Sequence, residues 1–156
     1  MWARLRRFSA LPRPAKALFL RAVIFLPLLT LCLRVRGFRA TQRLLRELVA
    51  PRKNRPCAAQ AGSSVTLTSR MVQAAVRNSP IPATCLEQSL CLWWLLARQG
   101  IVTQFRIGVR IEGEKLAAHA WVEYKGAAVG EPQGTHLHFA PFDEEMTAED
   151  LSGDAP

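Results

Sequence analysis

Cys85 and His119 are the two residues whose types and positions point most directly to chemistry. The segment Thr84-Cys85-Leu86-Glu87 has the pattern of a capping box, which predicts a helix that begins at Cys85. The unpaired amides at a helix start carry partial positive charge. They stabilise a thiolate and can bind the oxyanion that forms when the thiolate attacks a carbonyl. Position alone fits a small buried apolar cysteine equally well.

His119 is predicted on a strand, Ala117–Tyr124, whose alternation places His119, Trp121 and Glu123 on one face. A histidine beside a thiolate forms the ion pair that keeps the nucleophile activated, and a third polar group must orient the imidazole. Taken alone, such a histidine is better explained as a half-buried strand residue. Because the strand with His119 follows a helix that begins at a capped Cys85, the order of these elements favours a cysteine–histidine pair.

The motifs around these residues form a recognisable set. They are Cys85–Leu90 (CLEQSL), Gly100, Ile107–Arg110 (IGVR) and Ala118–Glu123 (AHAWVE). Together they resemble the transglutaminase-like peptidases of lasso-peptide biosynthesis, in the stand-alone form in which precursor recognition belongs to a separate protein. The resemblance covers residues 65–131 well and the N-terminal part loosely.

The resemblance implies a catalytic Cys, His and acid, carried over as Cys85, His119 and Glu131, where the family has Asp. A two-residue turn after Tyr124 would put Glu131 opposite Ala120, on the face away from His119. A three-residue loop or a bulge would bring it to the correct face. Glu123 is the alternative acid because it shares a face with His119.

The predicted fold is α+β, with a transglutaminase/papain-like core at residues 57–156 and a basic, partly apolar helical region at 1–56. The core consists of a buried helix from Cys85 to about Gln99 packed on a small antiparallel sheet. The expected strands are Val102–Ile111, Ala117–Tyr124 and Ala127–Val129. Upstream we expect helices at Ala15–Leu33, kinked near Pro27, at Ala40–Leu48 and at Thr68–Arg77, with a linker at 50–63.

Charge divides the chain at the same place. Residues 1–56 hold fourteen of the 21 basic residues and one of the twelve acids, a local net charge of +13, whereas residues 57–156 carry −4. The N-terminal region is therefore expected to bind an anionic partner, which is an acidic peptide, a partner protein or a membrane surface contacted peripherally. No nucleic-acid-binding motif is recognisable.

The apolar stretch Ala22–Leu33 is too short for a membrane span, which needs about 20 residues, and Arg34-Val35-Arg36 supplies no signal-peptide cleavage site. A buried or interfacial helix is favoured over a signal peptide. Cys32, Cys57, Cys85 and Cys91 are scattered without metal-ligand spacing. The sequence predicts reduced thiols, a cytoplasmic location, no metal and no cofactor.

The expected function is cleavage of a lasso-peptide precursor at the leader–core junction. The resemblance implies two partners besides the precursor peptide: a leader-peptide recognition protein and an ATP-using lasso cyclase. Acyl transfer to an amine is the enzymatic alternative. The non-catalytic alternative is an adaptor or membrane-surface protein that binds through residues 1–56.

Overall fold

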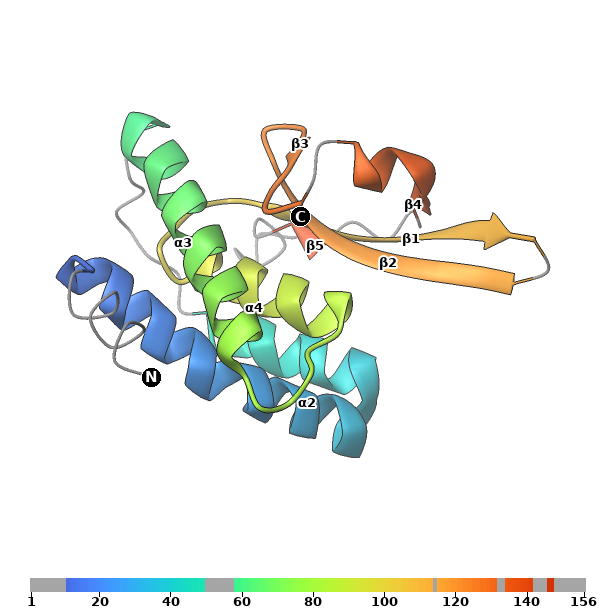
Figure 1. The fold of residues 1–156 in the computed structure, drawn as a ribbon, viewed down its shortest axis with the longest axis horizontal. Coiled ribbons are helices and arrows are strands. Elements are labelled where there is room, and N and C mark those ends of the chain that lie inside the picture. The colour runs from blue at the N-terminus through green and yellow to red at the C-terminus, as the bar shows by residue number, and fades with distance from the viewer. Residues whose placement is uncertain (1–10, 50–57, 114, 132–133, 142–145, 148–156) are drawn as a thin grey trace, which may run out of the picture.

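Three helices and a small antiparallel sheet make up the part of the chain that the computed structural model describes, which is residues 11–49, 58–113, 115–131, 134–141 and 146–147. The helices are α2 (Arg13–Glu47), α3 (Ala58–Asn78) and α4 (Cys85–Ala97). The strands are β1 (Gln104–Glu112), β2 (Lys115–Tyr124), β3 (Ala127–Ala128), β4 (Ala140–Pro141) and β5 (Met146–Thr147), with a 3₁₀ helix, η1 (Thr135–His138), before β4. The predicted α+β fold with a helical N-terminal part is confirmed (Figure 1).

Helix α4 lies at the centre, against α2 and α3 and against β1 and β2. The predicted capping box is present: Glu87 N donates to Thr84 Oγ1 (3.4 Å), and Thr84 N donates to a Glu87 carboxylate oxygen (2.6 Å). The helix ends at Ala97, and Gly100 follows with a φ of +75°, where glycine carries no steric penalty. Its buried residues lie almost all round, as predicted.

Helix α2 is broken at Gly37, which has non-helical backbone angles (φ 75°, ψ 176°). Its two halves correspond to the two predicted helices. Pro27 lies inside the first half with helical backbone angles. Among the described residues α2 is the one helix long and apolar enough to cross a membrane by length and composition, a test that core helices also pass.

Helix α3 begins ten residues earlier than predicted, so the assignment of residues 58–63 to a linker is wrong. Ala61 and Val65 continue the helical spacing of the buried Val72 and Ala75, and this apolar face packs in the core. Small Ala, Gly and Ser residues conceal that face in the sequence. The rest of the predicted linker, 50–57, lies outside the described residues.

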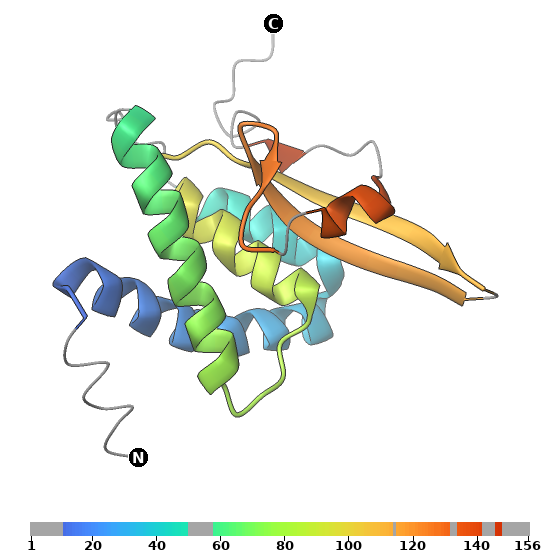
Figure 2. The same ribbon diagram turned by 45° about the horizontal axis from the view of Figure 1, so that its top comes forward.

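The sheet is antiparallel, in the order β3-β2-β1-β4, and β5 also pairs with β1. Long strands β1 and β2 form a hairpin that reaches beyond the helices, as Figures 1 and 2 show. Its register sets Arg106 opposite Trp121 and Gly108 opposite His119. One face of the hairpin therefore carries His119, Trp121 and Glu123, as predicted.

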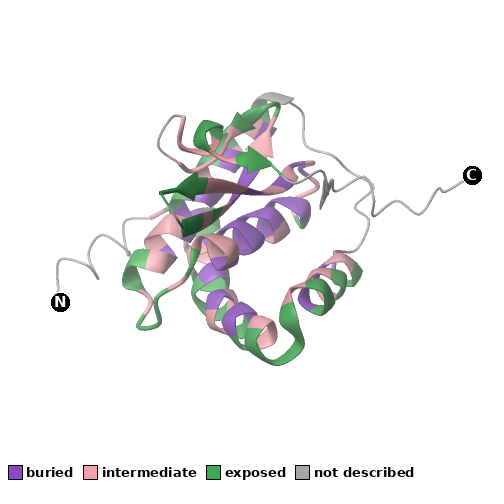
Figure 3. Cartoon of the chain, turned by 90° about the vertical axis from the view of Figure 1, so that its right-hand side faces the viewer, coloured by how far each residue is buried: buried purple, intermediate pink, exposed green. Residues whose placement is uncertain are grey.

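The core lies where the helices meet the sheet (Figure 3). One continuous cluster of buried residues includes Leu26 and Leu29 of α2, Leu90 and Trp93 of α4, and Phe105 of β1. The N-terminal helix thus contributes to the same core as the elements after residue 57. The division of the chain at residue 56 stays a prediction.

Candidate active site

Cys85 is the first residue of α4, and its side chain is partly exposed. The capping box satisfies the amide of Glu87, and Gln88 N bonds to Thr84 O (3.1 Å). The amides of Cys85 and Leu86 lie outside these contacts, next to the thiol. Amides in this position can stabilise a thiolate and can donate to an oxyanion.

Ser89 connects the Cys85 helix to the His119 strand. It lies one turn after Cys85, on the same side of α4, and its hydroxyl donates to the carbonyl of Ala120 (2.8 Å) in the buried interior. Ala120 is the chain neighbour of His119. This hydrogen bond joins α4, one turn after Cys85, to the segment of β2 that carries the histidine.

His119 contacts Glu131 directly, with 2.5 Å between Nε2 and Oε1. Both side chains are largely shielded, with 18% and 14% of their surfaces exposed. A partly buried carboxylate at this distance accepts a hydrogen bond from the imidazole and fixes the orientation of the ring. Because Nε2 makes this contact, proton exchange with a thiolate has to use Nδ1.

Glu131 reaches His119 by a route that neither of the two predicted turns describes. The turn has two residues, Lys125 (φ 53°) and Gly126 (φ 77°), and it pairs Tyr124 with Ala127. Val129 N still donates to Val122 O (2.8 Å). The chain then turns at Gly130, whose φ is +82°, before regular pairing could place Glu131 opposite Ala120. Of the two turns that the sequence left open, the two-residue turn is therefore the one present, and Gly130 ends the strand alternation before Glu131.

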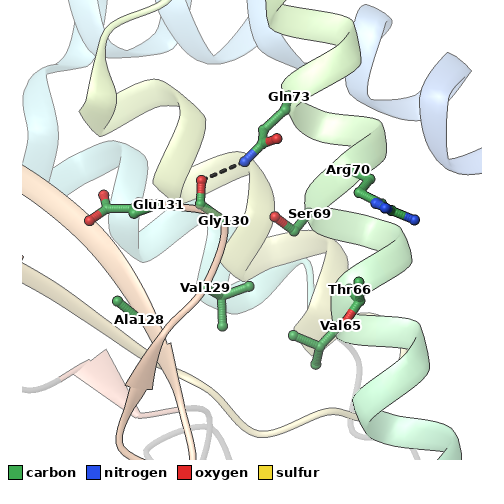
Figure 4. Close-up of a pocket in the computed structure, with 9 residues that line it drawn as sticks. All are labelled: Val65, Thr66, Ser69, Arg70, Gln73, Ala128, Val129, Gly130 and Glu131. Atoms are coloured by element: carbon green, nitrogen blue, oxygen red, sulfur yellow. Dashed lines mark hydrogen bonds between the residues drawn. The ribbon is translucent and has the colours of Figure 1, made fainter. Parts of the chain in front are cut away.

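Helix α3 contacts the turn at Gly130 and holds it in place (Figure 4). The Gln73 side-chain amide donates to the Gly130 carbonyl, and a Cβ at Gly130 would clash with Ser69 Oγ. Gly130, Glu131 and these two α3 residues line one pocket of about 400 Å³. In Figure 4 the Glu131 carboxylate points away from α3. Gln73 and Ser69 carry no signal in the sequence, because their contacts with Gly130 depend on how α3 packs.

Glu123, the alternative acid, is engaged elsewhere. Its carboxylate accepts a hydrogen bond from Trp121 Nε1 (2.8 Å) and forms an ion pair with Arg106 (3.5 Å). The structure therefore brings Glu131, and not Glu123, to His119. Trp121 is buried, with its ring centroid 6.0 Å from that of His119.

Gly108 and Phe139 complete the surroundings of the histidine. The Phe139 ring centroid lies 5.0 Å from that of His119. Gly108, opposite His119 in the sheet, has no room for a side chain, since a Cβ there would lie 2.9 Å from Trp121 Cη2 and 3.0 Å from Phe139 Cβ. Gly108 belongs to the Ile-Gly-Val motif found in the sequence. The reason for a glycine there could not be predicted, because it depends on where Phe139 packs.

The second cysteine of α4 differs sharply from Cys85. Cys91 is fully buried, and burial raises the pKa of its thiol from 9.0 to about 12. Cys32, Cys85 and Cys91 are free thiols. Within the described ranges, no three His, Cys, Asp or Glu side chains gather as a metal site would require.

Comparison with known proteins adds one finding. Residues 25–143 match the family model of the transglutaminase-like superfamily. The match begins inside α2 and includes Cys85, His119 and Glu131. No curated protein and no solved structure matches the chain.

Proposed function

We propose that this chain, which belongs to the transglutaminase-like superfamily, is a cysteine peptidase that removes the leader peptide from a lasso-peptide precursor. Cys85 is the nucleophile, His119 the general base and acid, and Glu131 the residue that orients the imidazole. The observation that carries this proposal is the His119–Glu131 contact on a strand joined to the start of the Cys85 helix.

The reaction follows from these positions. The Cys85 thiolate attacks the scissile carbonyl carbon, and the amides at the start of α4 donate to the resulting oxyanion. The C–N bond breaks while protonated His119 gives its proton to the departing amine, which leaves a thioester on Cys85. Water then attacks the thioester as His119 accepts its proton. The carboxylic acid departs, and the thiolate–imidazolium pair is restored.

The leader peptide is proposed as substrate on the strength of the motif set in the sequence. The Cys-Leu helix start, the Ile-Gly-Val strand and the His-Ala-Trp-Val-Glu string occur together at residues 85–123. The same resemblance supports a leader-peptide recognition protein and a lasso cyclase as partners. A small enzyme that depends on a delivery protein needs little substrate cleft of its own.

The decisive experiment is precursor cleavage followed by mass spectrometry. The wild-type chain, Cys85→Ala and Cys91→Ala are each mixed with a lasso-peptide precursor and its recognition protein. We expect wild type and Cys91→Ala to release the leader and Cys85→Ala to release none. Cys91→Ala is the matched control because it removes the buried thiol from the same helix.

Three outcomes would contradict the proposal in different ways. Undiminished cleavage by Cys85→Ala would show that the nucleophile is wrong. An amine adduct in place of the hydrolysed peptide would show that the chain is an acyltransferase with the same nucleophile. Binding of the precursor complex without any Cys85-dependent product would favour a non-catalytic adaptor.

A further inference from the structure

One side of α2 carries an apolar stripe that no described element covers. Its six side chains are 37% to 74% exposed, and most lie three or four residues apart, which places them along one side of the helix. The stripe consists of Leu20, Val23, Ile24, Leu28, Leu31 and Val35.

The stripe is a continuous surface feature rather than scattered exposed residues. From Leu20 to Val35 it extends about 22 Å along the helix, at 1.5 Å per residue. The buried Ala22, Leu26 and Leu29 hold the other side of α2 in the core. Contiguous exposed apolar surface of this extent marks an interaction site in many soluble proteins.

Arginines frame the stripe. Arg13 and Arg21 lie at its start and Arg34, Arg36 and Arg39 at its end, all of them exposed. The first turn of α2 contains no acidic residue, and the one acid of the helix is Glu47 in its last turn. An apolar stripe with exposed cations at both ends is complementary to a binding surface that has an apolar interior and anionic groups along its edge.

We propose that α2 binds the surface of an anionic lipid bilayer, lying in the interfacial plane with the stripe in the acyl-chain boundary and the arginines among the headgroups. This surface is independent of the chemistry at Cys85. The sheet lies on the other side of α4 from the first part of α2 (Figures 1 and 2). Binding therefore leaves the His119 side of the protein turned toward water.

Two other arrangements fit the same residues less well. A second copy would bring arginines against arginines, because both ends of the stripe are basic, whether two α2 helices pair parallel or antiparallel. A membrane crossing would require Leu26 and Leu29 to leave the core, where both are 2% exposed.

Vesicle flotation with the full-length chain tests the proposal. We expect flotation with phosphatidylcholine–phosphatidylglycerol vesicles and none with phosphatidylcholine alone. The double variant Ile24→Glu/Leu31→Glu should lose at least about tenfold in vesicle affinity, because each side chain contributes apolar area to the bilayer contact. The matched control is Ile111→Glu/Leu116→Glu, which alters two exposed apolar residues of the β1–β2 hairpin and should float like wild type.

Further arms distinguish the alternatives. Arg34→Ala/Arg36→Ala and salt of about 1 M should each weaken flotation, since both reduce attraction to anionic headgroups. Equal flotation of wild type and Ile24→Glu/Leu31→Glu would overturn the proposal, as would resistance to salt extraction, which indicates a spanning helix. Absence of vesicle binding would also overturn it. A stripe-dependent dimer in light scattering would then assign the stripe to a second copy, and stripe-dependent capture of the proposed leader-recognition protein would assign it to that partner.

Discussion

At the scale of single residues, the two cysteines of α4 have opposite properties six positions apart. Cys85 is partly exposed at the helix start, whereas Cys91 is fully buried with a pKa of about 12. A thiol with that pKa stays protonated through neutral and mildly alkaline pH. Cys91 is therefore not a nucleophile, and its burial shields it from electrophilic reagents.

This contrast predicts selective alkylation. In the folded protein, iodoacetamide should label Cys85 between about pH 7 and 9 and leave Cys91 unmodified, because only thiolates react at useful rates. Peptide mass spectrometry reports each cysteine separately. Labelling in urea is the control, since unfolding returns the pKa of Cys91 toward 9.0 and exposes it. Equal labelling of the two cysteines in the folded state would contradict the burial of Cys91.

Gly130 is the second residue with a sharp expectation. Gly130→Ala must adopt a φ of +82° and also places a methyl group against Ser69 Oγ, so the segment that carries Glu131 should shift. Gly126→Ala is a matched control, because Gly126 has a φ of +77° with nothing near its added Cβ. We expect about 1–2 kcal/mol of lost stability for Gly126→Ala, from backbone strain alone.

Gly130→Ala should lose more stability than that in urea unfolding and should also change the ¹⁵N shifts of the His119 imidazole, which Gly126→Ala should leave unchanged. Adding Ser69→Ala should recover part of the difference, because it removes the hydroxyl that the new methyl meets. If Gly130→Ala and Gly126→Ala behave alike in both measurements, α3 does not position the Glu131 segment.

At the scale of elements, the capping box at Thr84 fixes where α4 begins and hence where Cys85 lies. Thr84→Ala should cost about 0.5–2 kcal/mol of stability, and Thr84→Ser should cost little because serine keeps the hydroxyl. Thr84→Ala should also slow iodoacetamide labelling of Cys85, since fraying of the first turn weakens the amide cluster beside the thiol. Urea unfolding and labelling rates measure the two effects. Matching values for the Ala and Ser variants would show that the cap does not define the helix start.

The elements that could be predicted are those with a local physical signal. Alternation identified β1 and β2, and the Thr84–Glu87 pattern identified the start of α4. The two-residue strands β4 and β5 carry no such signal, because they are strands only through pairing with β1. The contact between His119 and Glu131 lies between these cases. His119 and Glu131 could be proposed from the sequence. The path of the chain that brings Glu131 to His119 could not, because it depends on the turn at Gly130 and on the contact of Gly130 with Gln73 of α3.

At the scale of the whole molecule, the two sides of α2 lie in different environments. One side completes the core that α4 and the sheet share, and the other is the exposed stripe. The sequence showed that this helix is apolar and basic, but it could not assign the two sides, because leucines occupy both. Leu28 and Leu29, adjacent in the chain, are 53% and 2% exposed.

This pair allows a test of whether α2 folds cooperatively with the rest of the chain. Leu29→Ala removes a side chain from the core cluster that includes Leu90, Trp93 and Phe105, so it should lower the free energy of unfolding by about 2–5 kcal/mol. Leu28→Ala should change the free energy of unfolding by at most about 0.5 kcal/mol, as surface substitutions do.

Urea unfolding followed by tryptophan fluorescence and by far-ultraviolet circular dichroism should give coincident transitions for both variants. The fluorescence reports on α4 and β2, which hold Trp93, Trp94 and Trp121. If Leu29→Ala left the fluorescence transition in place and shifted only the dichroism, α2 would be an appendage that unfolds separately from the part of the chain that carries Cys85 and His119. A shared shift would make α2 part of the folded unit that positions Cys85 and His119, so that its attachment to any surface would also hold that site in place.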